Sequence, residues 1–236
     1  MVNLIISFIS FVKNPNYKIS ENKKLKINHL LQLFIFILVL NIFLSFLTKG
    51  VFKFLNFPIY HNHFSFLLEA KKNYYYLFFK IVLVSPVLEE LLFRSILKPQ
   101  KKFISLFLFS LVIIIFNKVF MSSLLVSSAI SAAVVIPISF YLFKFELDKN
   151  LLNWYYKNYK IIVYSSSILF GFIHVINYRL TLSVLVLSPL YILPQIIAGF
   201  AYAFIRIRFG LFLSIFSHSV YNFFTFIMLI LITMLL

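Results

Sequence analysis

Long apolar runs separated by short clusters of basic residues dominate this 236-residue chain. A helix needs about 20 mostly apolar residues to cross a bilayer. Helices satisfy their own backbone hydrogen bonds, which lipid cannot do. The segments that reach or approach this length are residues 30–48, 73–97, 103–121, 122–143, 161–177, 182–205 and 210–236. The pattern predicts an all-α, polytopic integral membrane helix bundle with about seven to eight transmembrane helices.

The remaining segments suggest one membrane domain with a short N-terminal extension. Residues 1–29 are expected to form an interfacial or cytoplasmic segment whose first 12 residues make a short interfacial or half-spanning helix. They lack the basic start and small-residue cleavage site of a signal peptide. Residues 30–236 are expected to form the transmembrane domain, in which the polar loop 49–72 lies at the interface. No internal repeat or soluble second domain is visible.

Composition and charge limit the chemistry and the partners. The chain is 62% hydrophobic and has no cysteine, which rules out a disulfide or a thiolate nucleophile. Its net charge of +16 comes from 22 Lys and Arg against six Asp and Glu. Because these basic residues cluster between apolar runs, we expect them to contact membrane lipids and to set topology, and we expect no nucleic-acid partner. Their distribution among the loops predicts a cytoplasmic N-terminus.

Two adjacent glutamates and an arginine interrupt the apolar segment 73–97. Ionisable side chains inside a span are costly and are functional candidates by default. Arg94 follows Glu90 by four residues, about 40° around a helix, so the two side chains can pair. Glu89 points about 140° away from Arg94. The spacing predicts a structural Glu90–Arg94 pair that leaves Glu89 as the carboxylate available for chemistry.

Two further polar groups lie within predicted spans. Phe170 and His174 share one face of a helix, and His218 and Asn222 share a face of another. A single histidine or ion pair is more often structural than catalytic. Here, however, nearly all strongly polar intramembrane residues fall into three short groups. If the three helices converge, a carboxylate and two imidazoles among aromatic rings can polarise a water and stabilise an oxyanion.

Several intramembrane protease chemistries are excluded by missing motifs. The sequence contains no His-Glu-x-x-His, so a zinc protease of the site-2 type is excluded. The only aspartate is Asp148, in a loop, which leaves no aspartyl dyad. The absence of a Gly-x-Ser-Gly or Gly-x-Ser-x-Gly motif argues against a rhomboid-like serine enzyme.

The three polar groups together resemble the motifs of the CPBP family, which includes CAAX prenyl endopeptidases and the bacteriocin-processing or bacteriocin-immunity (Abi) membrane proteins. The resemblance covers about residues 75–230. Each motif is short, but their order and wide spacing are specific. The matching stretches are Glu89-Glu90-Leu-Leu-Phe-Arg94, Phe170-Gly-Phe-Ile-His174 and His218-Ser-Val-Tyr-Asn222.

The resemblance implies an intramembrane endopeptidase acting on a peptide or membrane-protein substrate. It implies that Glu89 and His174 activate the attacking water, that His218 and Asn222 hold the developing oxyanion, and that Glu90, Arg94 and Phe170 support the site. The family has been described both as metalloproteases and as metal-independent glutamate proteases. Zinc is therefore an open cofactor, for which Glu89, His174 and His218 are the candidate ligands.

Two other functions remain open at this stage. A non-catalytic bacteriocin-immunity or scaffold membrane protein would use the same cavity for binding. A proton-coupled transporter would use Glu89 and the histidines as a relay, although the lack of an inverted repeat disfavours it. The compact chain without appended domains is typical of a bacterial plasma-membrane protein, for which a peptide or membrane protein is a more natural substrate than a prenylated CAAX protein.

Overall fold

The computed structural model describes residues 2–17, 27–54, 73–119, 123–144, 147–178 and 181–235. Helices account for nearly all of these residues, which confirms the predicted all-α fold. The interfacial loop predicted at 49–72 lies mostly outside the described residues, and α2 continues to Phe54. The helices are α1 (Val2–Lys13), α2 (Ile27–Phe54), α4 (Tyr74–Phe78), the π-helical η1 (Phe79–Val84), α5 (Ser85–Arg94), the 3₁₀-helical η2 (Ser95–Leu97), α6 (Lys101–Val119), α7 (Leu124–Lys144), α8 (Lys149–Lys157), α9 (Tyr159–Phe172), the 3₁₀-helical η3 (Ile173–Asn177), α10 (Leu182–Tyr191), α11 (Leu193–Phe209) and α12 (Leu211–Leu235).

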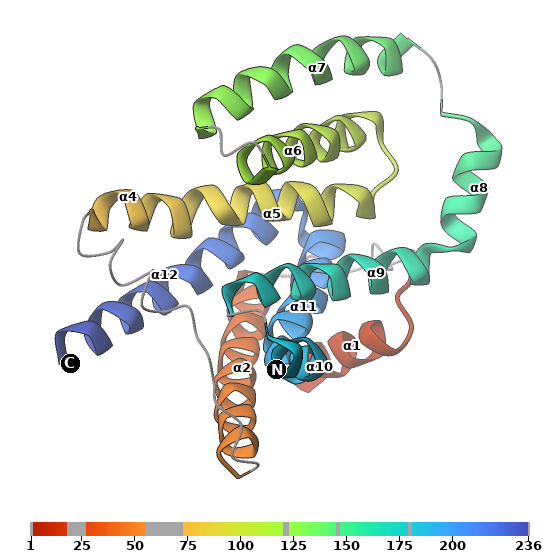
Figure 1. The fold of residues 1–236 in the computed structure, drawn as a ribbon. Helices are drawn as coiled ribbons and strands as arrows, with labels where there is room; N and C mark the ends of the chain where they lie inside the picture. Colours follow the sequence, from red (N-terminus) through yellow and green to blue (C-terminus); the bar gives the residue numbers. More distant parts are fainter. Residues whose placement is uncertain are drawn as a thin grey trace.

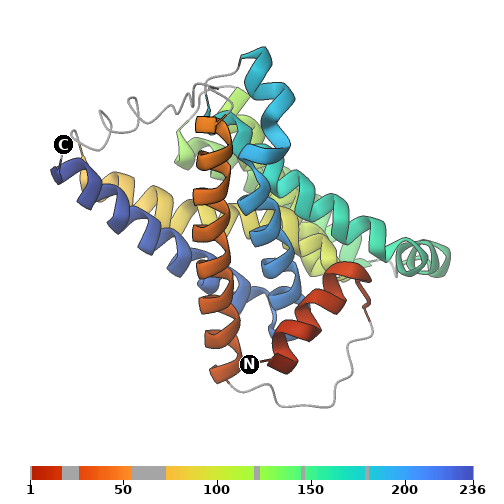
Figure 2. The ribbon, with the colours of Figure 1, turned by 90° about the horizontal axis from the view of Figure 1, so that it is seen from below.

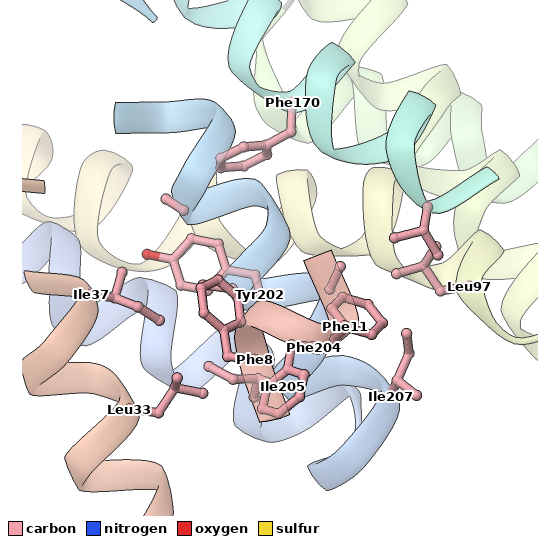
Figure 3. Packing of buried hydrophobic residues seen from close by; sticks show 14 of the residues in the cluster. Phe8, Phe11, Leu33, Ile37, Leu97, Phe170, Tyr202, Phe204, Ile205 and Ile207 are labelled. Atoms are coloured by element: carbon pink, nitrogen blue, oxygen red, sulfur yellow. The ribbon is translucent and has the colours of Figure 1, made fainter. Parts of the chain in front are cut away.

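Helix α11 is the centre of the bundle. Its residues from Ala198 to Ile207 are almost all buried, and its alternation of small and aromatic residues lets α1, α2, α9 and α12 approach it. Figure 2 shows α2 running alongside α11. Phe204 of α11 packs edge-on against Phe8 and Phe11 of α1, with ring centroids 5.7 and 5.4 Å apart (Figure 3). The N-terminal helix is thus part of the core.

Gly199 lets α11 pack directly against α9. A Cβ at this position would lie 2.7 Å from the Ser167 carbonyl oxygen and 3.2 Å from its Cα. Both atoms belong to the backbone of α9, so the clash is relieved only if the two helices move apart.

We therefore expect Gly199→Ala to lower the free energy of unfolding by about 1–3 kcal/mol, the usual cost of overpacking a core. Thermal unfolding in detergent measures the change. Gly50→Ala is the matched control, because no described atom lies within 4 Å of the added methyl group in α2. Equal unfolding midpoints for the two variants would contradict the close contact.

The helices α5, α6 and α7 form successive layers on one side of the bundle (Figure 1). On the other side, α12 crosses the α4–α5 segment and packs against both η1 and α5. The α9 helix approaches α5 from a third direction. As a result α5 is enclosed by helices that are distant in sequence, and its polar residues face the interior.

Pro86 lacks an N–H, and this alone predicts a kink in the helix that carries Glu89. In the structure a π-helical turn precedes α5 instead. In this turn the amide of Ser85 donates to the carbonyl of Lys80, five residues back. In the same register the carbonyl of Ile81 would accept from residue 86, which is proline and has no N–H. Asn222 Nδ2 of α12 donates to this carbonyl instead, at 3.0 Å. The backbone stays in the right-handed helical region through Val84 and Ser85, so the helix widens without restarting.

Fewer helices qualify as spans than the seven apolar segments suggested. Among the described residues four are long and apolar enough to cross a membrane, or five if α10 and α11, bent by 44°, count as one span. They are Leu30–Phe54, Leu124–Tyr141, Tyr159–Asn177 and Leu211–Met228, with the pair Val184–Tyr191 and Leu193–Phe209. The segment 73–97 is divided by the π-helical turn and carries four charged residues, Lys80, Glu89, Glu90 and Arg94. The exact number of spans stays a prediction.

Candidate active site

The three polar motifs meet at one place inside the bundle. Glu89 lies on α5, His174 on η3 and His218 on α12. Glu89 Oε2 is 4.0 Å from His174 Nε2 and 3.8 Å from His218 Nε2. The three helices therefore converge, which is the condition for a shared site. Residues separated by up to 129 positions in the chain (89 to 218) share one site.

Glu89 has a carboxylate oxygen to which no described side chain hydrogen-bonds. Its Oε2 atom is buried and has no hydrogen-bond partner among the described residues. The side chain as a whole is 19% exposed, so the carboxylate lies at the edge of an accessible space. Separations of 3.8 and 4.0 Å are too long for direct hydrogen bonds and short enough for a single water to contact the oxygen and an imidazole together.

Both histidines are held through Nδ1, which leaves Nε2 facing Glu89. His218 Nδ1 is 3.2 Å from Glu90 Oε1, and His174 Nδ1 is 2.8 Å from the Phe170 carbonyl oxygen. A carbonyl and an ionised carboxylate only accept, so in each case Nδ1 carries the hydrogen. In the neutral ring the Nε2 atom then has a free lone pair. His174 reaches this position because Phe170 lies in the last turn of α9, where carbonyl groups lose their helical partners.

Glu90 and Arg94 form the ion pair predicted from their spacing. Glu90 Oε2 and Arg94 Nε are 3.5 Å apart, and both side chains are 0% exposed. The Ser214 hydroxyl donates to Glu90 Oε2 at 2.5 Å, and Arg94 Nη1 donates to Ser166 Oγ at 2.9 Å. Because each charge has a countercharge and further hydrogen bonds, the cost of burying the pair is offset. The network joins α5, α9 and α12 directly behind the site.

Aromatic rings fix the two imidazoles from the sides. Tyr202 of α11 stacks on His218 with ring centroids 4.6 Å apart and an interplanar angle of 17°. The Phe170 ring lies between the two histidines, with centroids 5.1 Å from His174 and 5.5 Å from His218, and the Arg94 guanidinium packs over it at 4.8 Å. Phe170 is thus shared by all three motifs, which explains why an aromatic residue precedes His174 by one turn.

Asn222 lies one turn after His218 on α12, as its spacing predicted. One N–H of its amide is used by the Ile81 carbonyl. A side-chain amide has two N–H donors, so a second hydrogen remains for another acceptor.

Sequence reasoning missed four residues that hold this site together. They are Ser166, Ser214, Tyr202 and Arg206, the last of which donates from Nε to the Arg94 carbonyl at 3.0 Å. Ser214 had a usable signal, since it precedes His218 by four residues and shares its face. Tyr202 and Arg206 had none, because α11 carries no motif and its contacts are set by packing alone.

The donor atoms at the site are of the types that zinc prefers, namely one carboxylate oxygen and two imidazole nitrogens. Both imidazoles are also held from Nδ1 in the way that metal ligands usually are. However, no three His, Cys, Asp or Glu side chains in the described part of the chain are arranged closely enough to hold a metal ion. Zinc therefore remains an open cofactor, with Glu89, His174 and His218 as the candidate ligands.

A helical membrane bundle enclosing a carboxylate between two anchored imidazoles defines a membrane-embedded site suited to general acid–base chemistry. Comparison with known families agrees with this class. The family model of the type II CAAX prenyl endopeptidase Rce1-like proteins matches residues 71–224. This match spans most of the chain and all three motifs, so the chain belongs to that family, a family of membrane proteases. No curated protein and no solved structure matched this chain.

Proposed function

We propose that this protein is an intramembrane endopeptidase that hydrolyses a peptide bond of a membrane-associated protein or peptide. The observation that carries the proposal is the Oε2 atom of Glu89, which has no hydrogen-bond partner among the described residues. It lies 3.8 and 4.0 Å from two imidazole nitrogens whose rings are each fixed through Nδ1. A purely structural glutamate in a membrane would be paired, as Glu90 is. An unpaired one next to anchored histidines is suited to binding and activating a water.

In the proposed reaction Glu89 accepts a proton from the water while His174 Nε2 orients it. The hydroxide attacks the carbonyl carbon of the scissile bond. The π electrons of the carbonyl group move onto its oxygen, which becomes the oxyanion. When the tetrahedral intermediate collapses, the C–N bond breaks and the proton passes from Glu89 to the leaving amine. One carboxylate thus acts first as general base and then as general acid.

In the same proposal His218 and Asn222 stabilise the oxyanion. His218 Nε2 can donate only when the ring carries both protons, with Nδ1–H bonded to Glu90 and Nε2–H directed to the substrate oxygen. The second N–H of Asn222 supplies another donor. Preorganised donors of this kind contribute about 100- to 1000-fold each to kcat.

The proposal also covers the membrane in which the protein lies and its orientation there. We infer a bacterial plasma membrane with the N-terminus in the cytoplasm, because the basic loop residues are concentrated on that side. The substrate in that setting is a peptide or membrane protein, without a required prenyl group.

Peptide cleavage by the purified chain in detergent tests the proposal directly. The substrate should be a mixed library of prenylated and unmodified peptides, analysed by mass spectrometry with and without a chelator. Cleavage that persists with chelator supports the carboxylate mechanism. Cleavage that is lost with chelator and restored by zinc would replace the metal-free mechanism with one in which Glu89, His174 and His218 hold the metal.

A more specific result is expected from His174→Gln. We expect kcat to fall about 100-fold or more, because the imidazole Nε2 that orients the water is lost. The unfolding midpoint should change little, since the side chain is 21% exposed and lies outside the Glu90–Arg94 network. Wild-type kcat in a folded His174→Gln variant would rule out this role.

A further inference from the structure

A cavity of about 590 Å³ lies between the segment that follows α1 and the junction of α8 and α9, and none of its lining residues belongs to the three motifs. Figure 1 shows α1 beside this junction. The residues lining the cavity that matter here are Asn14, Tyr17, Tyr156, Lys157, Tyr159 and Lys160. No function discussed above uses them.

The walls of the cavity are fixed by contacts between the two segments. The Tyr164 hydroxyl of α9 donates to the carbonyl oxygens of Val12 and Lys13 at 2.9 and 3.0 Å, which ties the end of α1 to α9. The Tyr17 ring packs against Tyr156 and Tyr159, with centroids 5.1 and 5.5 Å apart. The cavity is therefore built by tertiary contacts and is not a gap between unrelated surface side chains.

Among the described residues that line the cavity, the charged side chains are both positive. They are the exposed lysines Lys157 and Lys160. The buried guanidinium of Arg206 adds positive potential, because it interacts electrostatically with Tyr17 and Tyr159. Arg206 Nη2 has no hydrogen-bond partner in the described part of the chain. Such a site attracts an anion.

The hydroxyl groups around the cavity suit the same kind of ligand. Burial, with a smaller contribution from Tyr156, raises the pKa of Tyr17 above its ordinary value. The phenol therefore stays protonated at physiological pH and can donate a hydrogen bond. Lysines, tyrosine hydroxyls and asparagine amides together provide the donors that phosphate oxygens accept.

The position of the cavity indicates where that phosphate comes from. Tyr159 is the first residue of a candidate span that runs to Asn177, whereas α8 has no buried residue and is amphipathic. The cavity thus lies where a span ends and an interfacial helix begins, at the level of lipid head groups. Tyrosines are typical of this boundary.

We propose that this cavity is a binding site for the phosphate group of an anionic phospholipid, held by Lys157 and Lys160 with Tyr17 and Asn14 as hydrogen-bond donors. It would fix one lipid against the α8–α9 junction and tie α1 to the membrane surface. Each lysine at an anionic membrane surface contributes on the order of 1 kcal/mol, so two correspond to a change in affinity of about 30-fold.

The test measures thermal unfolding of the full chain in neutral detergent while phosphatidylglycerol, phosphatidylcholine or inorganic phosphate is added. We expect phosphatidylglycerol alone to raise the unfolding midpoint of the wild type. In Lys157→Gln/Lys160→Gln the apparent Kd for phosphatidylglycerol should be about 30-fold weaker. Both side chains are exposed, so the variant is expected to fold.

Lys144→Gln/Lys149→Gln is the matched control, since it removes the same charge from exposed positions that do not line the cavity. This control should keep the wild-type affinity. An unchanged affinity in Lys157→Gln/Lys160→Gln, or an equal loss in both double variants, overturns the proposal. Stabilisation of the wild type by inorganic phosphate to the same extent as by phosphatidylglycerol would assign the cavity to a soluble phosphate and overturn the lipid assignment.

Discussion

Glu89→Gln is expected to lower kcat for peptide cleavage by about 1000-fold or more while the protein stays folded. Glutamine has nearly the same shape as glutamate and can still contact a water, but it cannot accept the proton. General acid–base groups contribute about 100- to 10,000-fold, and here one carboxylate is proposed to act in both directions. The initial rate of cleavage of a fluorogenic peptide in detergent measures the loss.

Asp148→Asn is the matched control for removal of one carboxylate. Asp148 caps α8 by accepting a hydrogen bond from the Leu151 amide at 3.2 Å, and asparagine caps helices equally well. Its cleavage rate should equal that of the wild type. A folded Glu89→Gln variant that still cleaves at the wild-type rate would refute the proposed chemistry. If it loses cleavage but keeps a cellular effect of the protein, that effect comes from binding, as in the immunity or scaffold function.

Arg94→Gln is expected to have the largest effect on stability. Its removal leaves Glu90 buried at 0% exposure without its countercharge and leaves Ser166 without the guanidinium donor. Breaking a buried pair in this way costs about 3–5 kcal/mol of unfolding free energy. Thermal unfolding in detergent, together with the yield of monodisperse protein, measures the loss.

The double variant Glu90→Gln/Arg94→Gln separates two possible causes of the instability of Arg94→Gln. One is the uncompensated charge of Glu90, and the other is the lost packing of the arginine side chain. With both charges removed, we expect it to unfold at a higher temperature than Arg94→Gln alone, because no buried charge is left unpaired. Its cleavage rate should remain low, since His218 Nδ1 loses its carboxylate partner. A double variant less stable than the sum of the two single changes would show that the ion pair is not the source of the cost.

Helical spacing predicted the local relationships of the site. Glu90 with Arg94, Phe170 with His174 and His218 with Asn222 each follow from four-residue spacing on a helix, and the first two pairs make the contacts expected of them. Spacing also predicted that Glu89 points away from Arg94 and does not pair with it. These relationships depend only on helix geometry, so the sequence contains all that is needed to find them.

The contacts between helices were not predictable in the same way. Ser214 reaches Glu90 only because α12 packs on α5 in one particular register, and Tyr202 reaches His218 only because α11 packs on α12 in another. Apolar periodicity specifies neither register. The π-helical turn was expected only as a kink, since the position of a widened turn depends on its neighbours. The exact number of spans stays a prediction, because apolar composition does not reveal where a helix bends or breaks, as it does between α10 and α11.

The widened turn before α5 helps to set the orientation of the Glu89 carboxylate. A π-helical turn is equivalent to one residue inserted into an α-helix, and each residue advances a helix by about 100°. Deletion of a single residue between Phe79 and Val84 would restore a regular helix and rotate the aromatic stretch Tyr74–Phe78 by that angle relative to Glu89. The direction in which Glu89 points, relative to the exposed tyrosine rings that precede it, is therefore set by one inserted residue, and insertions or deletions here should be far more harmful than substitutions.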